Sequence, residues 1–97
     1  MFSYNIFKQS SDTLLAICDY EILGKTFESG ELQITVSEFY EGKKCDSKAA
    51  LKLAEEATII NAVGNKIIKL LMEKDIVDGS SVLKIGDVMH AQVVSMK

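Results

Sequence analysis

The chain has 97 residues, of which 47% are hydrophobic and 26% are charged, and its formal net charge is −3. This size and composition are typical of one globular domain, so we expect residues 1–97 to form a single domain. All 11 basic residues are lysines, and arginine is the residue best suited to grip phosphate and guanine. Tight autonomous binding to naked nucleic acid is therefore not expected, although a local lysine patch could act within a larger assembly.

Membrane insertion and secretion are also not expected. No apolar run reaches the ~18 residues that a bilayer-spanning helix needs, and no basic segment precedes the first apolar residues. The two cysteines, Cys18 and Cys45, are too few for a disulfide framework. These features favour a reducing, cytoplasmic setting.

The first third of the chain predicts a hairpin and a helical turn. Apolar and polar residues alternate over residues 2–6, and a near-continuous apolar run over residues 13–18 is typical of a strand that is covered on both faces. Residues 9–12 read as the turn between them. Residues 19–24 predict a short helical turn, which Asp19 could cap and Gly24 could end in a left-handed conformation.

The middle of the chain predicts one strand and two helices. Residues 27–31 read as a turn or loop, residues 31–37 as a strand, and residues 38–44 as a loop. Apolar residues then recur at helical spacing over residues 48–73, after Asp46 or Ser47 as a cap. One helix of that length would extend about 40 Å, so we expect a break within residues 59–65. Asn61 could cap the second helix, and Gly64 allows close backbone approach.

The last third predicts a second hairpin. Residues 77–81 form a turn, and residues 82–85 and 88–94 read as strands. Gly86 and Asp87 join them, and glycine in the first position suits a tight type II′ turn. The predicted fold is therefore α+β, with a largely antiparallel sheet of about four or five strands that is packed by two main helices.

The only histidine lies in the last predicted strand. Side chains alternate along a strand, so His90 and Gln92 point to the same face, about 7 Å apart. Such a pair could bind a planar polar group, whereas the plainer alternative is a histidine that packs under a loop and bonds a backbone carbonyl. If Asn61 lies near them, the three would form a polar cluster among apolar neighbours, as in a binding pocket.

Five short motifs resemble an archaeal family known as domain of unknown function 424, in the same order and over about residues 18–94. They are Cys18 with Asp19, Leu23 to Lys25, Phe39 with Tyr40, Asn61 with Gly64, and His90 to Gln92. Members of that family often have proline before the histidine, whereas this chain has Met89 and no proline. The resemblance implies an archaeal, cytoplasmic, single-domain protein, and it makes a role in information processing plausible.

The sequence contains few signals of a catalytic or metal-binding site. No close pair of metal ligands such as Cys-x-x-Cys is present, and no P-loop pattern accompanies the glycine–lysine pairs. Cys18 could form a thiolate–imidazolium pair with His90 if the fold brings them together. We expect no metal, no cofactor and no catalytic residue.

We therefore predict a non-enzymatic binding protein, associated with RNA or a ribonucleoprotein such as the translation apparatus, or with a protein partner. The alternatives are a small-molecule-binding protein or minor enzyme with a pocket around His90 and Cys18, and a purely structural assembly subunit. The candidate binding residues are Asp19, Lys25, Tyr40, Asn61, Gly64, His90 and Gln92.

Overall fold

Eight strands and two α-helices make up the fold, which the computed structural model describes for residues 1–94. The strands are β1 (Phe2–Gln9), β2 (Asp12–Asp19), β3 (Thr26–Ser29), β4 (Leu32–Thr35), β5 (Lys43–Cys45), β6 (Ile59–Val63), β7 (Val82–Ile85) and β8 (Val88–Val94). The helices are α1 (Ser47–Glu56) and α2 (Asn65–Glu73), and two 3₁₀ turns are η1 (Tyr20–Ile22) and η2 (Gly79–Ser81). None of the helices within residues 1–94 is long and apolar enough to cross a membrane.

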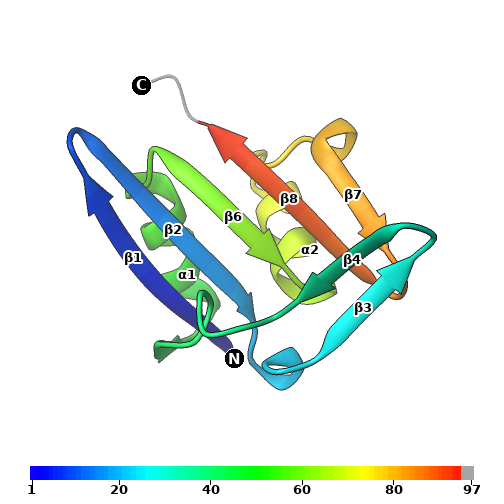
Figure 1. The fold of residues 1–97 in the computed structure, drawn as a ribbon. Helices are drawn as coiled ribbons and strands as arrows, with labels where there is room; N and C mark the ends of the chain where they lie inside the picture. The colour runs from blue at the N-terminus through cyan, green and yellow to red at the C-terminus, as the bar shows by residue number, and fades with distance from the viewer. Residues whose placement is uncertain (95–97) are drawn as a thin grey trace.

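Six of the strands form one sheet in the order β5-β1-β2-β6-β8-β7, and β3 and β4 form a separate hairpin. Neighbouring strands of the sheet are antiparallel except for β2 and β6, which run parallel. Figure 1 shows both helices behind the sheet and the β3–β4 hairpin crossing in front of it. We call these two sides the helix face and the front face.

The helix face carries the larger core. Leu15 and Ile17 of β2 pack there with Ile67 and Leu71 of α2, and all four side chains are buried. The helix α1 begins as the sequence predicts, because the Asp46 carboxylate accepts a hydrogen bond of 2.9 Å from the amide of Ala49.

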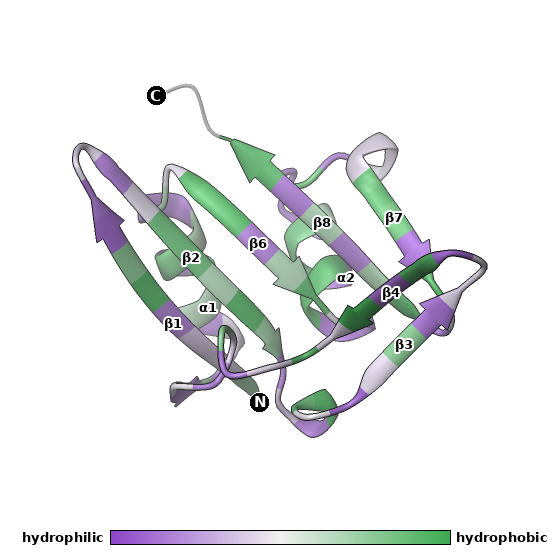
Figure 2. Cartoon of the chain, viewed as in Figure 1, coloured by the Kyte–Doolittle hydropathy of each residue, from purple (hydrophilic) through white to green (hydrophobic). Residues whose placement is uncertain are grey.

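The front face carries a smaller core beneath the hairpin and the loop that follows it. Ala16, Cys18 and Val63 of the sheet pack there with Val36 and Tyr40. The strand β2 is thus covered on both faces, as its apolar run predicts. Figure 2 shows β2, β6 and β8 as largely apolar, with a polar band in the middle of β6 and of β8.

The predicted α+β class, the two main helices and the largely antiparallel sheet are confirmed. Both predicted hairpins of the sheet are present, and Gly86 has the positive φ of 62° that the first central position of a type II′ turn requires. Gly24 also follows its helical turn with a positive φ of 84°.

The predicted strand count was wrong, because the sheet has six strands. The main reason is β6, which the helical spacing of residues 48–73 concealed. The break between the helices is an inner strand of the sheet. Its residues Ile59, Ile60 and Val63 are β-branched, and the strand has buried side chains on both faces, as is typical of an inner strand. Asn61 therefore lies within a strand and caps no helix.

Two further segments that were predicted as loops are strands. Residues 26–29 pair with β4 throughout, and the hydroxyls of Thr26 and Thr35 lie 2.9 Å apart across the hairpin. Lys43 and Lys44 belong to β5, which pairs with the first residues of β1. Pairing with a distant strand outweighs the low β-propensity of lysine there.

Candidate functional site

A polar network lies in the middle of the sheet and is centred on Asn61. The Oδ1 atom of Asn61 accepts a hydrogen bond of 2.6 Å from the Tyr40 hydroxyl and lies 3.0 Å from Nε2 of His90. Because a carboxamide oxygen only accepts, Nε2 of His90 carries the proton. Burial lowers the pKa of His90, so the ring is neutral at pH 7 and its Nδ1 atom is an acceptor.

The loop that delivers Tyr40 is fixed by polar residues of β1. The Ser3 hydroxyl donates to the Tyr40 carbonyl at 2.8 Å and accepts from the Gly42 amide at 3.2 Å. The Asn5 side chain donates to backbone carbonyls of the loop over residues 38–41. Burial raises the pKa of Tyr40 to about 12, so its hydroxyl stays protonated and remains a donor to Asn61.

Aromatic side chains border this network on the β1 side. The rings of Phe7 and Phe39 stack with centroids 5.2 Å apart and planes within 8°, and Phe39 meets Tyr40 edge-on at 5.0 Å. Phe7 is 42% exposed and Phe39 is 37% exposed, so this pair is accessible to a ligand. Gln92 is also exposed, and it lies directly opposite Asn61 in the register of β6 and β8.

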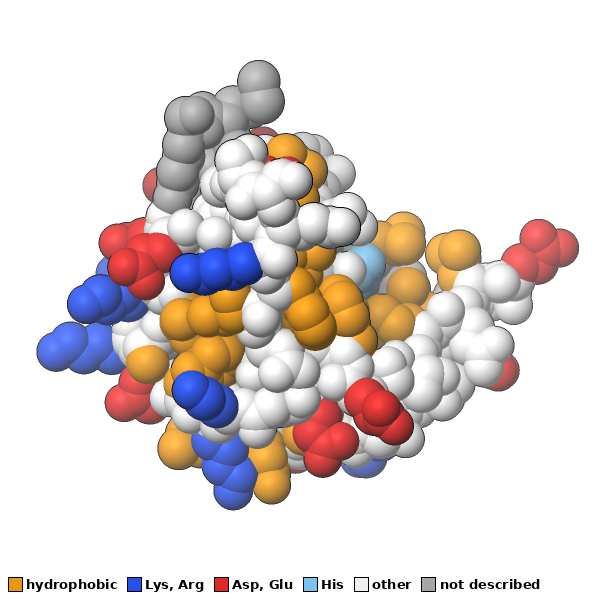
Figure 3. Space-filling view, turned by 60° about the vertical axis from the view of Figure 1, so that its left-hand side comes forward, with side chains coloured by type: hydrophobic (Ala, Val, Ile, Leu, Met, Phe, Trp, Pro, Cys, Tyr) orange, Lys and Arg blue, Asp and Glu red, His pale blue; other side chains and the backbone are white. Residues whose placement is uncertain are grey.

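Some hydrogen-bonding groups of the network remain available to a ligand. No buried side-chain nitrogen or oxygen in residues 1–94 lacks a partner. The Nδ2 amide of Asn61 and the Nδ1 atom of His90, which the contacts with Oδ1 do not use, therefore reach solvent. Figure 3 shows the imidazole in a recess between apolar side chains.

The accessible part of the front face thus combines stacked aromatic rings with amide and imidazole groups. We call it the open face and define it by six residues that the hairpin leaves accessible. They are Phe7, Leu14, Phe39, Asn61, His90 and Gln92.

A second polar cluster is closed. Asp19 is 4% exposed, and its carboxylate accepts hydrogen bonds from the amides of Lys66 at 3.0 Å and Ile67 at 2.9 Å. It therefore caps α2, and the prediction that its side chain caps the turn at residues 20–24 was wrong, because η1 has no side-chain cap. Burial raises the pKa of Asp19 even though the two N–H groups favour its charged form.

Gly64 is required by this closed cluster. Its φ is +129°, and a Cβ there would lie 2.6 and 2.7 Å from the two carboxylate oxygens of Asp19. Gly64 was predicted to allow a close approach of two backbones, whereas the group that approaches it is the side-chain carboxylate of Asp19. Gly64 serves the architecture and contributes no ligand group to the open face.

Of the predicted site residues, the structure brings Tyr40, Asn61, His90 and Gln92 together. Asp19 and Gly64 form the separate closed cluster. Lys25 is exposed at the base of the hairpin, where its carbonyl accepts from the Val36 amide at 2.9 Å, and no hydrogen bond links it to the network.

The possible nucleophile is remote from the histidine. Val63 of β6 separates Cys18 from His90 in the register, which places their backbones roughly 9–10 Å apart. Burial, with a smaller effect of the nearby Asp19, raises the pKa of Cys18 to about 12. A thiolate at Cys18 is therefore scarce at neutral pH. No group of three or more His, Cys, Asp or Glu within residues 1–94 is arranged to hold a metal.

Sequence reasoning missed Phe7, Ser3 and Asn5. A signal for Phe7 was present: it is an apolar residue at a position where the alternation of residues 2–6 calls for a polar one. An apolar residue on the polar side of an edge strand indicates either a further packing layer or a contact surface. For Ser3 and Asn5 no local signal exists, because their partners are backbone groups some 35 residues away.

Comparison with known proteins identifies the family. The family model described as "Protein of unknown function (DUF424)" matches residues 7–96. The chain belongs to the DUF424 family. The resemblance carried by the five motifs is therefore confirmed.

One solved structure is similar to this DUF424 chain, an uncharacterized conserved protein from Methanopyrus kandleri. The two are 24% identical with a TM-score of 0.79, over 99% of this chain and 94% of that one. This likeness shows a shared fold. A search of curated proteins finds no match.

Proposed function

We propose that this DUF424 chain is a non-enzymatic binding domain that contacts single-stranded RNA within a cytoplasmic ribonucleoprotein, such as the translation apparatus. The observation that carries the proposal is the composition of the open face. It places the exposed Phe7–Phe39 pair beside the unused polar groups of Asn61, His90 and Gln92.

Each part of the open face suits a part of a nucleotide. Bases stack on aromatic rings, and such stacking contributes about 1–3 kcal/mol per base. The Asn61 amide offers a donor, because its oxygen already accepts from Tyr40 and His90, the Gln92 amide offers a donor and an acceptor, and Nδ1 of His90 offers an acceptor. An unpaired base displays matching groups on its edges, which is why RNA-binding proteins often read single-stranded segments on open sheets.

The charge of the chain limits how this contact forms. With a net charge of −3 and no arginine, the chain gains little from counterion release by free RNA. We therefore expect weak binding to isolated RNA, and stronger association where neighbouring proteins or folded RNA hold the single strand in place. Stacking and hydrogen bonds would supply most of the affinity.

The first test is an NMR titration of the ¹⁵N-labelled protein with eight-nucleotide RNA homopolymers at low ionic strength. We expect shifts confined to the open face, and an affinity that falls about fivefold in Phe7→Ala, since one stacking platform is lost. The matched control is Ile6→Ala, because Ile6 is equally exposed, at 42%, but points to the helix face. The absence of shifts with all homopolymers would count against the proposal.

A second readout addresses the ribonucleoprotein itself. The protein should sediment with ribosomal subunits in a sucrose gradient, and Phe7→Ala and Gln92→Ala should release it into the upper fractions. Gln33→Ala, an exposed glutamine on the hairpin strand β4, is the control for Gln92→Ala. If the wild type stays at the top of the gradient, the association with the translation apparatus is refuted.

The geometry favours this proposal over an enzyme that uses Cys18. The thiol is fully buried, its pKa is raised to about 12, and Val63 stands between it and His90. An activated cysteine needs the opposite surroundings, namely access to solvent and a nearby positive charge or base.

A further inference from the structure

The outer edge of β1 is only partly covered. The short strand β5 pairs with residues 2–4 of β1, whereas β1 itself continues to Gln9. Residues 5–9 therefore have β2 on one side and no strand on the other. An uncovered edge of this kind is a template for an added strand.

The backbone groups available at this edge can be identified. A Cβ on Gly42 would collide with the Tyr4 carbonyl, so the peptide groups of Tyr4 point outward toward β5. Backbone direction repeats every two residues along a strand, so the N–H and C=O groups of Ile6 and Lys8 point outward as well. These four groups have no partner strand.

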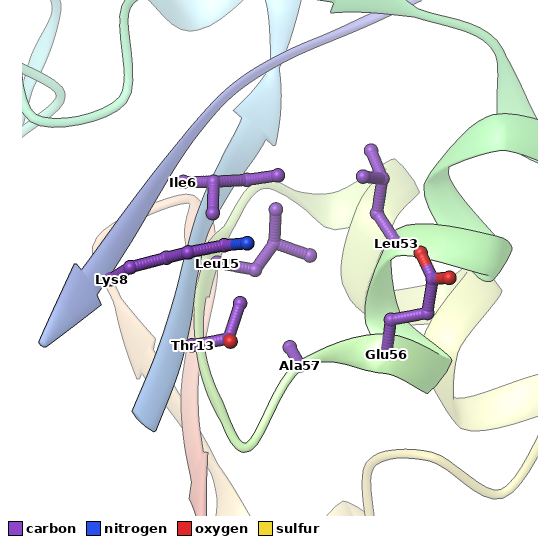
Figure 4. A pocket seen from close by; sticks show the side chains of 7 residues that line it. All are labelled: Ile6, Lys8, Thr13, Leu15, Leu53, Glu56 and Ala57. Atoms are coloured by element: carbon purple, nitrogen blue, oxygen red, sulfur yellow. The ribbon is translucent and has the colours of Figure 1, made fainter. Parts of the chain in front are cut away.

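A hollow lies directly beside these groups on the helix face, between β1 and α1. Its volume is about 270 Å³. Figure 4 shows Ile6 and Lys8 pointing from β1 toward the helix, and Leu53 and Glu56 on the helix opposite. Seven side chains line it, namely Ile6, Lys8, Thr13, Leu15, Leu53, Glu56 and Ala57.

Two lysines and one glutamate, Lys8, Lys43 and Glu56, line the hollow and the depression beside it, and none of the three forms an ion pair within the described part of the chain. The only ion pair within residues 1–94 joins Lys66 and Glu21, on another part of the surface. Lys8 lines the hollow, and Lys43 lines the neighbouring depression with Tyr4, Asn5 and Ile6. Figure 3, which views the molecule from the β1 side, shows lysine side chains beside an apolar surface, with carboxylates further around it.

We propose that this edge binds an extended acidic peptide of a protein partner, which adds as a strand antiparallel to β1 and in line with β5. Residues directly opposite each other in a sheet point to the same face. An apolar peptide residue opposite Ile6 enters the hollow, and an acidic residue opposite Lys8 meets its ammonium. In this antiparallel register the residue opposite Lys8 comes two positions before the apolar one. A second acidic residue, two positions after the apolar one, reaches the start of β5 at Lys43, where the peptide leaves the edge.

The test uses a synthetic peptide with both ends capped. It has glutamate at each end, threonine in the second and fourth positions and leucine in the centre, and its affinity is measured by ¹⁵N NMR titration. The expected shifts lie on residues 5–9 and on α1. Replacing both glutamates by lysine, or the leucine by alanine, should weaken binding.

Backbone methylation of the peptide separates strand addition from binding through side chains alone. The leucine amide would face β1, so its N-methylation should weaken binding at least about tenfold, whereas methylation of a threonine amide should change it less than about twofold. Equal effects of the two methylations would overturn the proposal.

Matched protein variants separate this edge from the open face. Lys8→Glu and Ile6→Ala should weaken peptide binding about fivefold, because they remove the charge and the apolar wall. Lys84→Glu on the opposite edge strand β7 and Phe7→Ala on the open face should leave it unchanged. No peptide binding by the wild type, or pairing of two chains through this edge in sedimentation, would refute the proposal.

Discussion

Two polar clusters lie within the same sheet and differ in how their hydrogen bonds are used. Around Asp19, both carboxylate oxygens accept from backbone amides of α2, and the side chain is 4% exposed. Around Asn61, one oxygen serves both Tyr40 and His90, while other groups of the same residues reach solvent. The hydrogen bonds of the first cluster are all made within the protein, whereas the second cluster keeps groups that can still bond a ligand.

This difference indicates that the Asp19 cluster stabilises the fold, whereas the Asn61 cluster is available to bind a ligand. A buried polar group whose bonds are all made inside the protein holds elements together, and its loss leaves buried amides without partners. A half-buried group with a free donor or acceptor contributes less to stability but can bind a ligand. Substitutions in the closed cluster should therefore affect folding strongly, and those in the open one should affect it weakly.

The largest effect is expected for Gly64→Ala. The backbone at φ +129° is accessible almost only to glycine, and the new methyl group would meet the Asp19 carboxylate. We expect a loss of about 3–5 kcal/mol in the free energy of unfolding, measured by urea denaturation. Gly24→Ala is the control, since its φ is +84° with nothing within 4 Å, and should cost about 1 kcal/mol. Similar losses in both variants would contradict the close packing at Gly64.

Asp19→Ala should have the next largest effect. It removes the acceptor for two amides at the start of α2, so we expect a loss of about 2–3 kcal/mol in the free energy of unfolding. The comparison is Asp46→Ala, which removes the exposed cap of α1 and should cost about 1 kcal/mol. If the two substitutions lower the free energy of unfolding equally, the burial of Asp19 adds nothing to the stability that its cap of α2 provides.

The smallest effect is expected from protonation of His90. Burial holds its pKa in the folded state below the ordinary 6.5, so the folded protein binds this proton less readily than the unfolded chain. Its contribution to stability is complete above pH 6.5 and is lost as the pH falls through the lowered value. Solvent screening of the partly exposed ring keeps this loss small.

The measurement is urea denaturation of the wild type and of His90→Gln at pH 7.5 and pH 5.5. The carboxylates titrate in both proteins, so their contribution drops out when the stability change of the variant is subtracted from that of the wild type. The wild type should lose slightly more stability than the variant on acidification, and the imidazole should titrate below 6.5 in NMR spectra. A larger loss in the variant would show that His90 is not held neutral.

Local signals in the sequence predicted local features well. The cap at Asp46, the turn at Gly86 and the alternation in β8 each depend on a few neighbouring residues, and each is confirmed. The strand β6 was missed because an apolar run beside two helical stripes fits a buried strand as well as a helix. The pattern alone does not contain the information that separates the two.

The candidate site depends on contacts that no local pattern encodes. His90 and Gln92 share a face because β8 is a strand, which the sequence predicts. Their meeting with Asn61 follows from the insertion of β6 between β2 and β8, and the partners of Asp19 lie 47 and 48 positions along the chain. Strand order is set by packing of the whole domain, so only the polar residue types could be selected in advance.

The position of β6 also has a consequence for synthesis on the ribosome. β6 is an inner strand, but its second neighbour is β8, the last strand within residues 1–94. Until residues 88–94 have emerged, the apolar side of a nascent sheet ends in an unpaired edge at Ile59 to Val63. The emerging polypeptide is therefore exposed to aggregation until β8 has emerged, and a premature stop before Val88 would leave a chain that chaperones must retain.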